Sequence, residues 1–315
     1  MIGFKIILAY LLDLVTGLLP GAPGGLPHPV KVIGSFVSAQ ESFYRKNFSS
    51  LLFAGGALAV VTVASVYMVS IGLEKAAFAV NPAAGFLIGV ALVYFSISPE
   101  PLAREGAKIY RLLKSEDEEG ARKELSMIVG RDTGLMTKAD IIRACVETLA
   151  ENSVDAVISP LFFAAIGGGP LAMAYRAVNT LDSMTGYRNE KYELLGKVSA
   201  RLDDAANFFP ARFSILVILA ASFLLRYDAK GCLRTAMRDR LKHPSPNSAH
   251  PESAFAGALG IRLGGESYYG GVLKEKPFLG DGPPAYDAVV VARAVWLLRL
   301  TSLITCLFFA CATYL

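Results

Sequence analysis

The 315-residue sequence lacks the motifs that several large enzyme classes require. No GxxxxGK[ST] loop, GxSxG elbow or HExxH helix occurs, which excludes a Walker-type nucleotide site, an α/β-hydrolase nucleophile and a zincin. The four cysteines have no CxxC spacing, so neither a zinc site nor a disulfide framework is indicated. The net charge is only +4 and no basic run is interleaved with aromatic residues. We therefore expect no nucleic-acid partner.

Charge is scarce and apolar residues are abundant. Charged residues make up 18% and hydrophobic residues 53% of the chain, and the mean hydropathy is +0.45. The apolar residues are gathered into blocks, and crossing a bilayer takes a helix of about 20 such residues. We predict an all-α, polytopic integral membrane protein, a single membrane-embedded domain over residues 1–315 with four to six embedded helices. The apolar segments are approximately 2–19, 50–73, 83–98, 154–178, 208–225 and 296–315.

Nearly all of the charge lies in the four polar regions 20–49, 99–152, 179–207 and 227–293. Within the second, Glu100–Val129 has apolar residues at three-to-four spacing, typical of amphipathic helices on the cytoplasmic side. Lysine and arginine near the helix ends place these regions in the cytoplasm, which predicts a multi-pass protein of the cell (inner) membrane with its active site on the cytoplasmic face.

The apolar segment 154–178 is interrupted by Pro160 and by the run Gly167–Pro170. Such a segment is broken or re-entrant, because protein or water must satisfy the freed backbone groups. The distribution of basic residues requires segments 154–178 and 208–225 either both to cross the membrane or both not to cross. The second arrangement is favoured, because it keeps every charged block on one side.

Two prolines enclose a histidine just after the first apolar segment. The run Pro27–Lys31 points His28 and Lys31 toward the membrane surface, since the prolines fix the backbone. A simple turn with an interfacial lysine is the alternative. Both residues are candidates for binding substrate or phosphate.

A second polar group lies on both sides of the broken segment. Glu151 and Asp155 are one helical turn apart, at a point where burying charge is costly. Asp203 and Asp204 form a carboxylate patch suited to Mg²⁺, which prefers one or two carboxylates plus water and phosphate oxygens. The alternative is a solvated helix face with ion pairs. The other members are polar residues that could contact phosphates, amides or an amine: Asn152, Arg176, Asn179, Asp182, Arg188, Arg201 and Asn207.

A third group is the run Ser245–Glu252, which is followed by several glycines and contains Asn247. Small residues ahead of a helix can present backbone amides to an anion. A plain turn before a glycine-rich helix is the competing interpretation.

At these three groups the chain resembles the CobD/CbiB family, the adenosylcobinamide-phosphate synthases of cobalamin biosynthesis. The matching stretches extend in order from Asp13 to Gly271, so the resemblance covers most of the chain. The most specific run is NTLDSMTGYRN followed by ARLDDAAN, whereas PHPV alone would be a weak signal. The turn Ser248–His250 departs from the family pattern, which has a glycine and an aromatic residue there.

The resemblance implies a ligase that uses ATP and Mg²⁺ to join a carboxylate of adenosylcobyric acid to (R)-1-amino-2-propanol O-phosphate or aminopropanol. The product would be adenosylcobinamide phosphate, and the reaction would pass through an acyl phosphate intermediate. Asp203 and Asp204 would hold the metal, and the catalytic candidates are Glu151, Asp155 and Asp182. Phosphate and substrate contacts would come from His28, Lys31, Asn152, Arg176, Asn179, Arg188, Arg201, Asn207 and Asn247. The implied partners are the lipid bilayer, a second copy of the chain or other cobalamin-pathway enzymes.

Two other functions remain open. A magnesium-dependent lipid phosphotransferase would also use adjacent aspartates and arginines at a membrane surface, and it predicts a hydrophobic groove beside Asp203. A membrane sensor or transporter would explain the helix layout without catalysis. The number of carboxylates where insertion is expensive argues against the second of these alternatives.

Overall fold

The computed structural model describes every residue except 19–28, 188 and 315, and the contacts between its residues divide it into two compact units. Unit 1 comprises Met1–Ser98, Ser159–Asn207 and Cys306–Leu315, and unit 2 comprises Pro99–Ile158 and Phe208–Thr305. The chain therefore passes between the units several times. The expectation of one domain over the whole chain stays a prediction.

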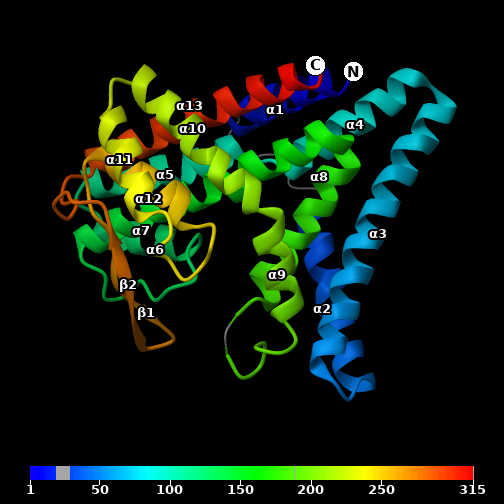
Figure 1. Cartoon of the computed structure of the whole chain (residues 1–315), viewed down its shortest axis with the longest axis horizontal. Coiled ribbons are helices and arrows are strands. Elements are labelled where there is room, and N and C mark those ends of the chain that lie inside the picture. The colour runs from blue at the N-terminus through cyan, green and yellow to red at the C-terminus, as the bar shows by residue number, and fades with distance from the viewer. Residues whose placement is uncertain (19–28, 188, 315) are drawn as a thin grey trace. The chain divides into compact units, whose positions relative to one another are not determined.

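Unit 1 is built from helices. It contains α1 (Ile2–Leu18), α2 (Pro29–Asn47), α3 (Leu51–Val80), α4 (Pro82–Ser96), α8 (Ser159–Thr185), α9 (Lys197–Ala206) and the end of α13 (Val289–Ala312). Helices α3, α4 and α8 pack on one another, and α2 runs beside α3 (Figure 1). Asp13 and Lys5 of α1 are buried, as expected for charges inside an apolar segment, and Lys5 forms an ion pair with Glu74 of α3.

Within the described residues, four stretches are long and apolar enough to cross a membrane: Leu51–Val80, Pro82–Lys114, Lys138–Thr185 and Val289–Ala312. A fifth is possible if α9 and α10 (Phe208–Leu224), bent by 42°, form one span. In α3 only 28% of the most apolar stretch is buried within the protein, and side chains such as Phe53 and Met68 are exposed. An outward apolar surface of this kind is expected against lipid, which confirms the predicted class of helical membrane protein.

The predicted break in segment 154–178 is confirmed. Inside α8, Gly167 and Gly168 leave helical geometry, and Gly168 has a φ of +69°, which glycine adopts without strain. A second irregularity precedes α8, where Val154–Ile158 forms a π-helical turn just before Pro160. The backbone is therefore distorted both before α8 and within it. π-helical turns are frequent at functional sites.

Unit 2 has shorter helices and holds most of the charge. It contains α5 (Pro99–Lys114), α6 (Glu118–Ser126), α7 (Lys138–Ser153), α10, α11 (Ala229–Asp239), α12 (Ala249–Leu259) and most of α13. Helix α5 buries Ala103, Gly106, Ile109 and Leu113 and packs on α6, which confirms the amphipathic pattern predicted for residues 100–129. Helix α12 is buried along its whole length, among α7, α10 and α11.

A small β-hairpin in unit 2 was not predicted. Strands β1 (Leu263–Tyr269) and β2 (Val272–Leu279) pair antiparallel and appear in orange in Figure 1. Helix α12 ends at Leu259, because Gly260 takes the left-handed conformation that terminates helices. The glycine-rich helix of the competing interpretation therefore does not continue beyond Leu259, and the next glycines belong to the irregular start of β1.

Candidate functional site

In unit 1, Asn207 connects three side chains from α8 and α9. Its Oδ1 accepts hydrogen bonds from Ser159 Oγ at 2.5 Å and Tyr175 Oη at 2.9 Å, and its Nδ2 donates to Asp203 Oδ2 at 2.9 Å. The oxygen of an amide can only accept and its nitrogen can only donate, so these contacts fix the orientation of the Asn207 side chain. Asn207 thereby positions the Asp203 carboxylate.

The other residues around Asp203 are also those the sequence singled out. Asp182 and Asp204 repel its charge, and the Asn179 amide lies beside it. Asp203 Oδ1 is buried and makes no hydrogen bond of normal geometry within the described residues. Asn179 Oδ1 in turn lies 3.4 Å from Arg176 Nη1. The structure therefore brings Arg176, Asn179, Asp182, Asp203 and Asn207 together.

This arrangement fits a divalent cation that is shared with a substrate. Carboxylates close to one another, with a buried oxygen lacking a donor, favour a positive charge between them. Within the described residues no three His, Cys, Asp or Glu side chains are grouped as an all-protein metal site. Mg²⁺ does not require such a group, because substrate phosphates and water usually complete its octahedral shell.

Other predicted residues of unit 1 lie at its surface. Lys31 is exposed at the start of α2. The side chain of Arg201 is 77% exposed and stands 3.9 Å from Asp204, too loose a pair to fix either group. His28 and Arg188 lie outside the described residues.

The predicted residues Glu151, Asn152, Asp155 and Asn247 belong to unit 2. Glu151 lies in the last turn of α7 and Asp155 in the π-helical turn, so the regular one-turn spacing assumed from the sequence is interrupted between them. Asn152 Nδ2 donates to Thr148 O at 3.0 Å, within its own helix. Glu151 Oε1 accepts a hydrogen bond from Ser248 Oγ at 2.9 Å.

Sequence reasoning missed a buried ion pair one turn before Glu151. Glu147 Oε2 lies 2.6 Å from Arg131 Nη2, and the two side chains are only 4% and 8% exposed. Glu147 Oε1 also accepts the backbone N–H of Gly264 at 2.8 Å. Gly264 has a φ of +83°, so a residue other than glycine would be strained there. This pair ties α7 to the hairpin.

Further titratable groups surround this pair. Burial, together with Glu151 and Glu147, raises the pKa of Glu252 well above its usual value. The pKa of Lys276 is raised by Glu252 and other acidic neighbours despite a burial effect in the opposite direction. Burial lowers the pKa of His243. Glu252 belongs to the third polar group, Ser245–Glu252. No sequence pattern indicated that it lies near Lys276 or Glu147.

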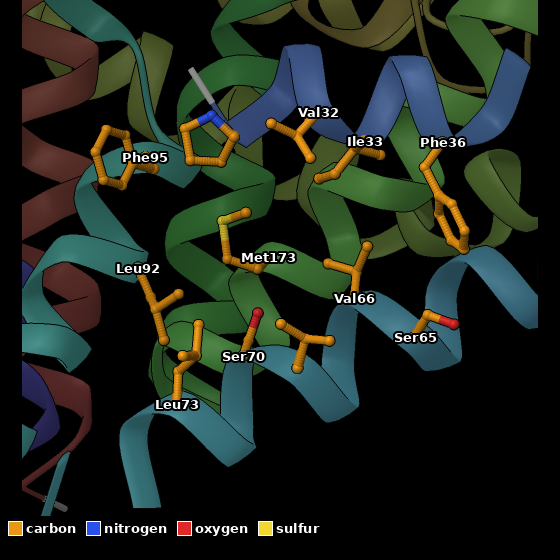
Figure 2. A pocket seen from close by; sticks show the side chains of 12 residues that line it. Val32, Ile33, Phe36, Ser65, Val66, Ser70, Leu73, Leu92, Phe95 and Met173 are labelled. Atoms are coloured by element: carbon orange, nitrogen blue, oxygen red, sulfur yellow. The ribbon is translucent and has the colours of Figure 1, made fainter. Parts of the chain in front are cut away.

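A separate apolar cavity of about 460 Å³ lies in unit 1 among α2, α3, α4 and α8. Figure 2 shows Phe95, Met173 and Ile33 among its lining side chains. Among the described residues that line it, hydroxyl groups come only from Ser65 and Ser70, and none is ionisable. Asp203 is not among the lining residues, so this cavity is not the groove that the lipid phosphotransferase hypothesis predicts.

The chain is similar to known proteins over almost its whole length. A family model described as CobD/Cbib protein matches residues 6–298. The chain belongs to the CobD/CbiB family. Among CobD/CbiB relatives, the cobalamin biosynthesis protein CobD of Clostridium perfringens is 48% identical over 278 residues, which cover 88% of this chain and 87% of the relative.

Two further relatives match almost end to end. The cobalamin biosynthesis protein CobD of Listeria monocytogenes serovar 1/2a is 43% identical over 97% of this chain and 98% of its own length. The cobalamin biosynthesis protein CbiB of Salmonella typhi is 41% identical over 97% of both chains. No solved structure matches this member of the CobD/CbiB family.

Proposed function

We propose that this protein acts in cobalamin biosynthesis as an ATP-dependent amide ligase. It would join a carboxylate of adenosylcobyric acid to 1-amino-2-propanol O-phosphate or aminopropanol, at the cytoplasmic face of the cell membrane. The observation that carries the proposal is the family match over residues 6–298, together with near full-length relatives named for cobalamin biosynthesis.

The chemistry needs two bond-forming steps. The substrate carboxylate attacks the terminal phosphorus of ATP, which forms an acyl phosphate and releases ADP. The amine then attacks the acyl carbon, the C–O bond to phosphate breaks, and inorganic phosphate leaves while the nitrogen loses a proton. Both steps depend mainly on holding the reactants in position and on neutralising phosphate charge.

The residues around Asp203 support the nucleotide half of this reaction. Asp203, with Asp182 and Asp204 close by, would hold Mg²⁺, which neutralises charge on the ATP phosphates. Arg176, close to Asn179, would contact phosphate oxygens. Asn207 would act as a positioning residue, since it holds the Asp203 carboxylate through Nδ2.

The test is ATP turnover by the full-length, detergent-solubilised protein with Mg²⁺ and adenosylcobyric acid, with and without aminopropanol phosphate. We expect phosphate release to require both substrates, with a cobinamide product identified by mass. Asp203→Asn should lower the rate at least about 100-fold, as expected for loss of a metal ligand. The matched control is Glu193→Gln, an exposed acid just before α9. Wild-type protein without corrinoid-dependent turnover would overturn the proposal, and turnover of a polyprenyl diphosphate would favour the lipid phosphotransferase.

A further inference from the structure

Unit 2 contains a buried histidine whose ring has no hydrogen-bond partner. His250, in the first turn of α12, has 0% of its surface exposed. Neither Nδ1 nor Nε2 forms a hydrogen bond of normal geometry with the described residues, although the backbone of Asn247 lies beside the ring. A buried polar ring without partners is costly, so such a group signals a missing ligand or water.

Two arginines from neighbouring helices lie close to this ring. Arg212 of α10 and Arg240 at the C-cap of α11 both lower the pKa of His250, which together with burial brings it to about 4. The imidazole is therefore neutral at pH 7, and one of its nitrogens carries a hydrogen that can be donated. His250 thus adds a donor to this site without adding charge.

The two guanidinium groups are not neutralised by acids. Arg212 Nη1 donates to Phe208 O at 2.6 Å and lies 3.3 Å from Asn247 Oδ1, and both of these acceptors are uncharged. The Nε atom of Arg240 is buried without a hydrogen-bond partner. Among the residues that the structure describes, no carboxylate lies within ion-pair distance of either arginine. The two positively charged guanidinium groups, with the neutral ring of His250 close by, favour an anion between them.

We propose that Arg212, Arg240 and His250 form a binding site for a phosphate-type oxyanion. Arginine is suited to this role because its planar fork donates two parallel hydrogen bonds to one phosphate. The positive end of the α12 dipole adds to the attraction, since His250 lies in the first turn of this 11-residue helix. These three residues belong to unit 2, whereas the Asp203 group belongs to unit 1.

The turn that leads into α12 joins this site to a carboxylate. Asn247 contacts Arg212, and the next residue, Ser248, donates a hydrogen bond to Glu151 at 2.9 Å. Glu151 is exposed. The adjacent turn residues Asn247 and Ser248 thus contact an arginine and a carboxylate, which could meet the two ends of a small ligand that has a phosphate at one end and an ammonium at the other. This assignment of the ligand rests on the proposed function, whereas the anion site itself does not.

The experiment measures binding to the full-length protein in detergent by titration calorimetry, without corrinoid. The probes are inorganic phosphate, 1-amino-2-propanol O-phosphate and a non-hydrolysable ATP analogue. Arg212→Gln and Arg240→Gln should each weaken phosphate binding about 10- to 100-fold, as expected for loss of a charge-assisted pair. Arg212→Lys, which keeps the charge and loses the fork, should fall between wild type and Arg212→Gln. The matched control is Arg234→Gln, an exposed arginine of α11, which should bind as wild type.

The probes distinguish the source of the phosphate. If the arginine variants weaken binding of the amino alcohol phosphate and leave the ATP analogue unchanged, the site holds the amine substrate, and the reverse result assigns it to the nucleotide. Histidine-selective NMR provides a second measurement, in which phosphate should shift the His250 ring signals in wild type and in Arg234→Gln. Binding that is absent, or equal in wild type and both Arg→Gln variants, would overturn the site. Because no corrinoid is present, this failure is distinguishable from failure of the ligase reaction.

Discussion

The two units hold acidic residues in different surroundings. The groups that act most strongly on Asp203 in unit 1 are two other carboxylates and two asparagine amides. In unit 2, Glu147 is paired with Arg131, and Glu252 has both Lys276 and Arg131 nearby. The Asp203 group of unit 1 therefore favours a cation supplied from outside, whereas Glu147 of unit 2 is neutralised by a residue of the protein itself. The difference shows that a residue type alone does not define a metal site.

The largest expected effect tests whether the pairing in unit 2 is structural. Glu147→Ala leaves Arg131 buried without its partner and frees the Gly264 N–H, so it should lower the free energy of unfolding by about 3–5 kcal/mol. The control is Glu118→Ala, which breaks a more exposed pair with Arg122 and should cost about 1 kcal/mol or less. Chemical unfolding in detergent, followed by circular dichroism, measures both. Equal losses would mean that the Glu147 pair contributes no more than a surface pair.

A smaller effect tests how unit 1 holds its carboxylate. Asn207→Ala removes three hydrogen bonds and leaves Tyr175 and Ser159 without their acceptor, so we expect a loss of about 1–3 kcal/mol in the free energy of unfolding. Asn47→Ala, which removes an exposed amide that bonds only to Phe43 O, should cost less than about 0.5 kcal/mol. An Asn207→Ala protein as stable as wild type would show that this network does not hold α8 and α9 together.

The third effect depends on pH and concerns Glu252. Its pKa is raised in the folded state, so the unfolded chain loses this proton at a lower pH than the folded chain does. Wild-type stability should therefore fall as pH rises from about 4.5, by up to about 1.4 kcal/mol per pH unit, until the folded carboxyl ionises.

Glu252→Gln cannot ionise, so its stability relative to wild type should increase between pH 4.5 and 8 and differ little at pH 4. Thermal unfolding across this range measures the difference. The matched control is Glu119→Gln, an exposed residue of α6, whose difference from wild type should stay nearly constant. A Glu252→Gln difference that does not change with pH would contradict the buried, repelled state of this carboxyl.

Much of the fold follows from local pattern. The run Gly167–Pro170 predicted a broken helix, because glycine and proline interrupt the backbone hydrogen bonds wherever they occur, and α8 leaves helical geometry at Gly167 and Gly168. The hairpin was missed because its glycines were considered only as part of an anion-binding turn or of a glycine-rich helix. Their positive φ angles in β1 depend on contacts with β2 and Arg143, which are distant in sequence.

The candidate sites divide in the same way. Asp182, Asp203 and Asn207 could be named from the sequence, because acidic and amide residues beside apolar segments are unusual and the family resemblance includes them. Their association with Ser159 and Tyr175 could not, since an ordinary hydroxyl within a helix carries no signal. The role of the metal, and of every residue named for it, stays a prediction.

The class of helical membrane protein and the CobD/CbiB family could both be predicted from the sequence, because apolar length and specific motifs are properties of the chain read in order. Which charged groups lie close together became apparent only in the folded protein. Arg212, Arg240 and His250 come from three different helices, and Glu147 meets Arg131 across a loop and Gly264 from the hairpin. Electrostatic and hydrogen-bond energies depend on separation in space and on burial, and neither can be read from separation along the chain.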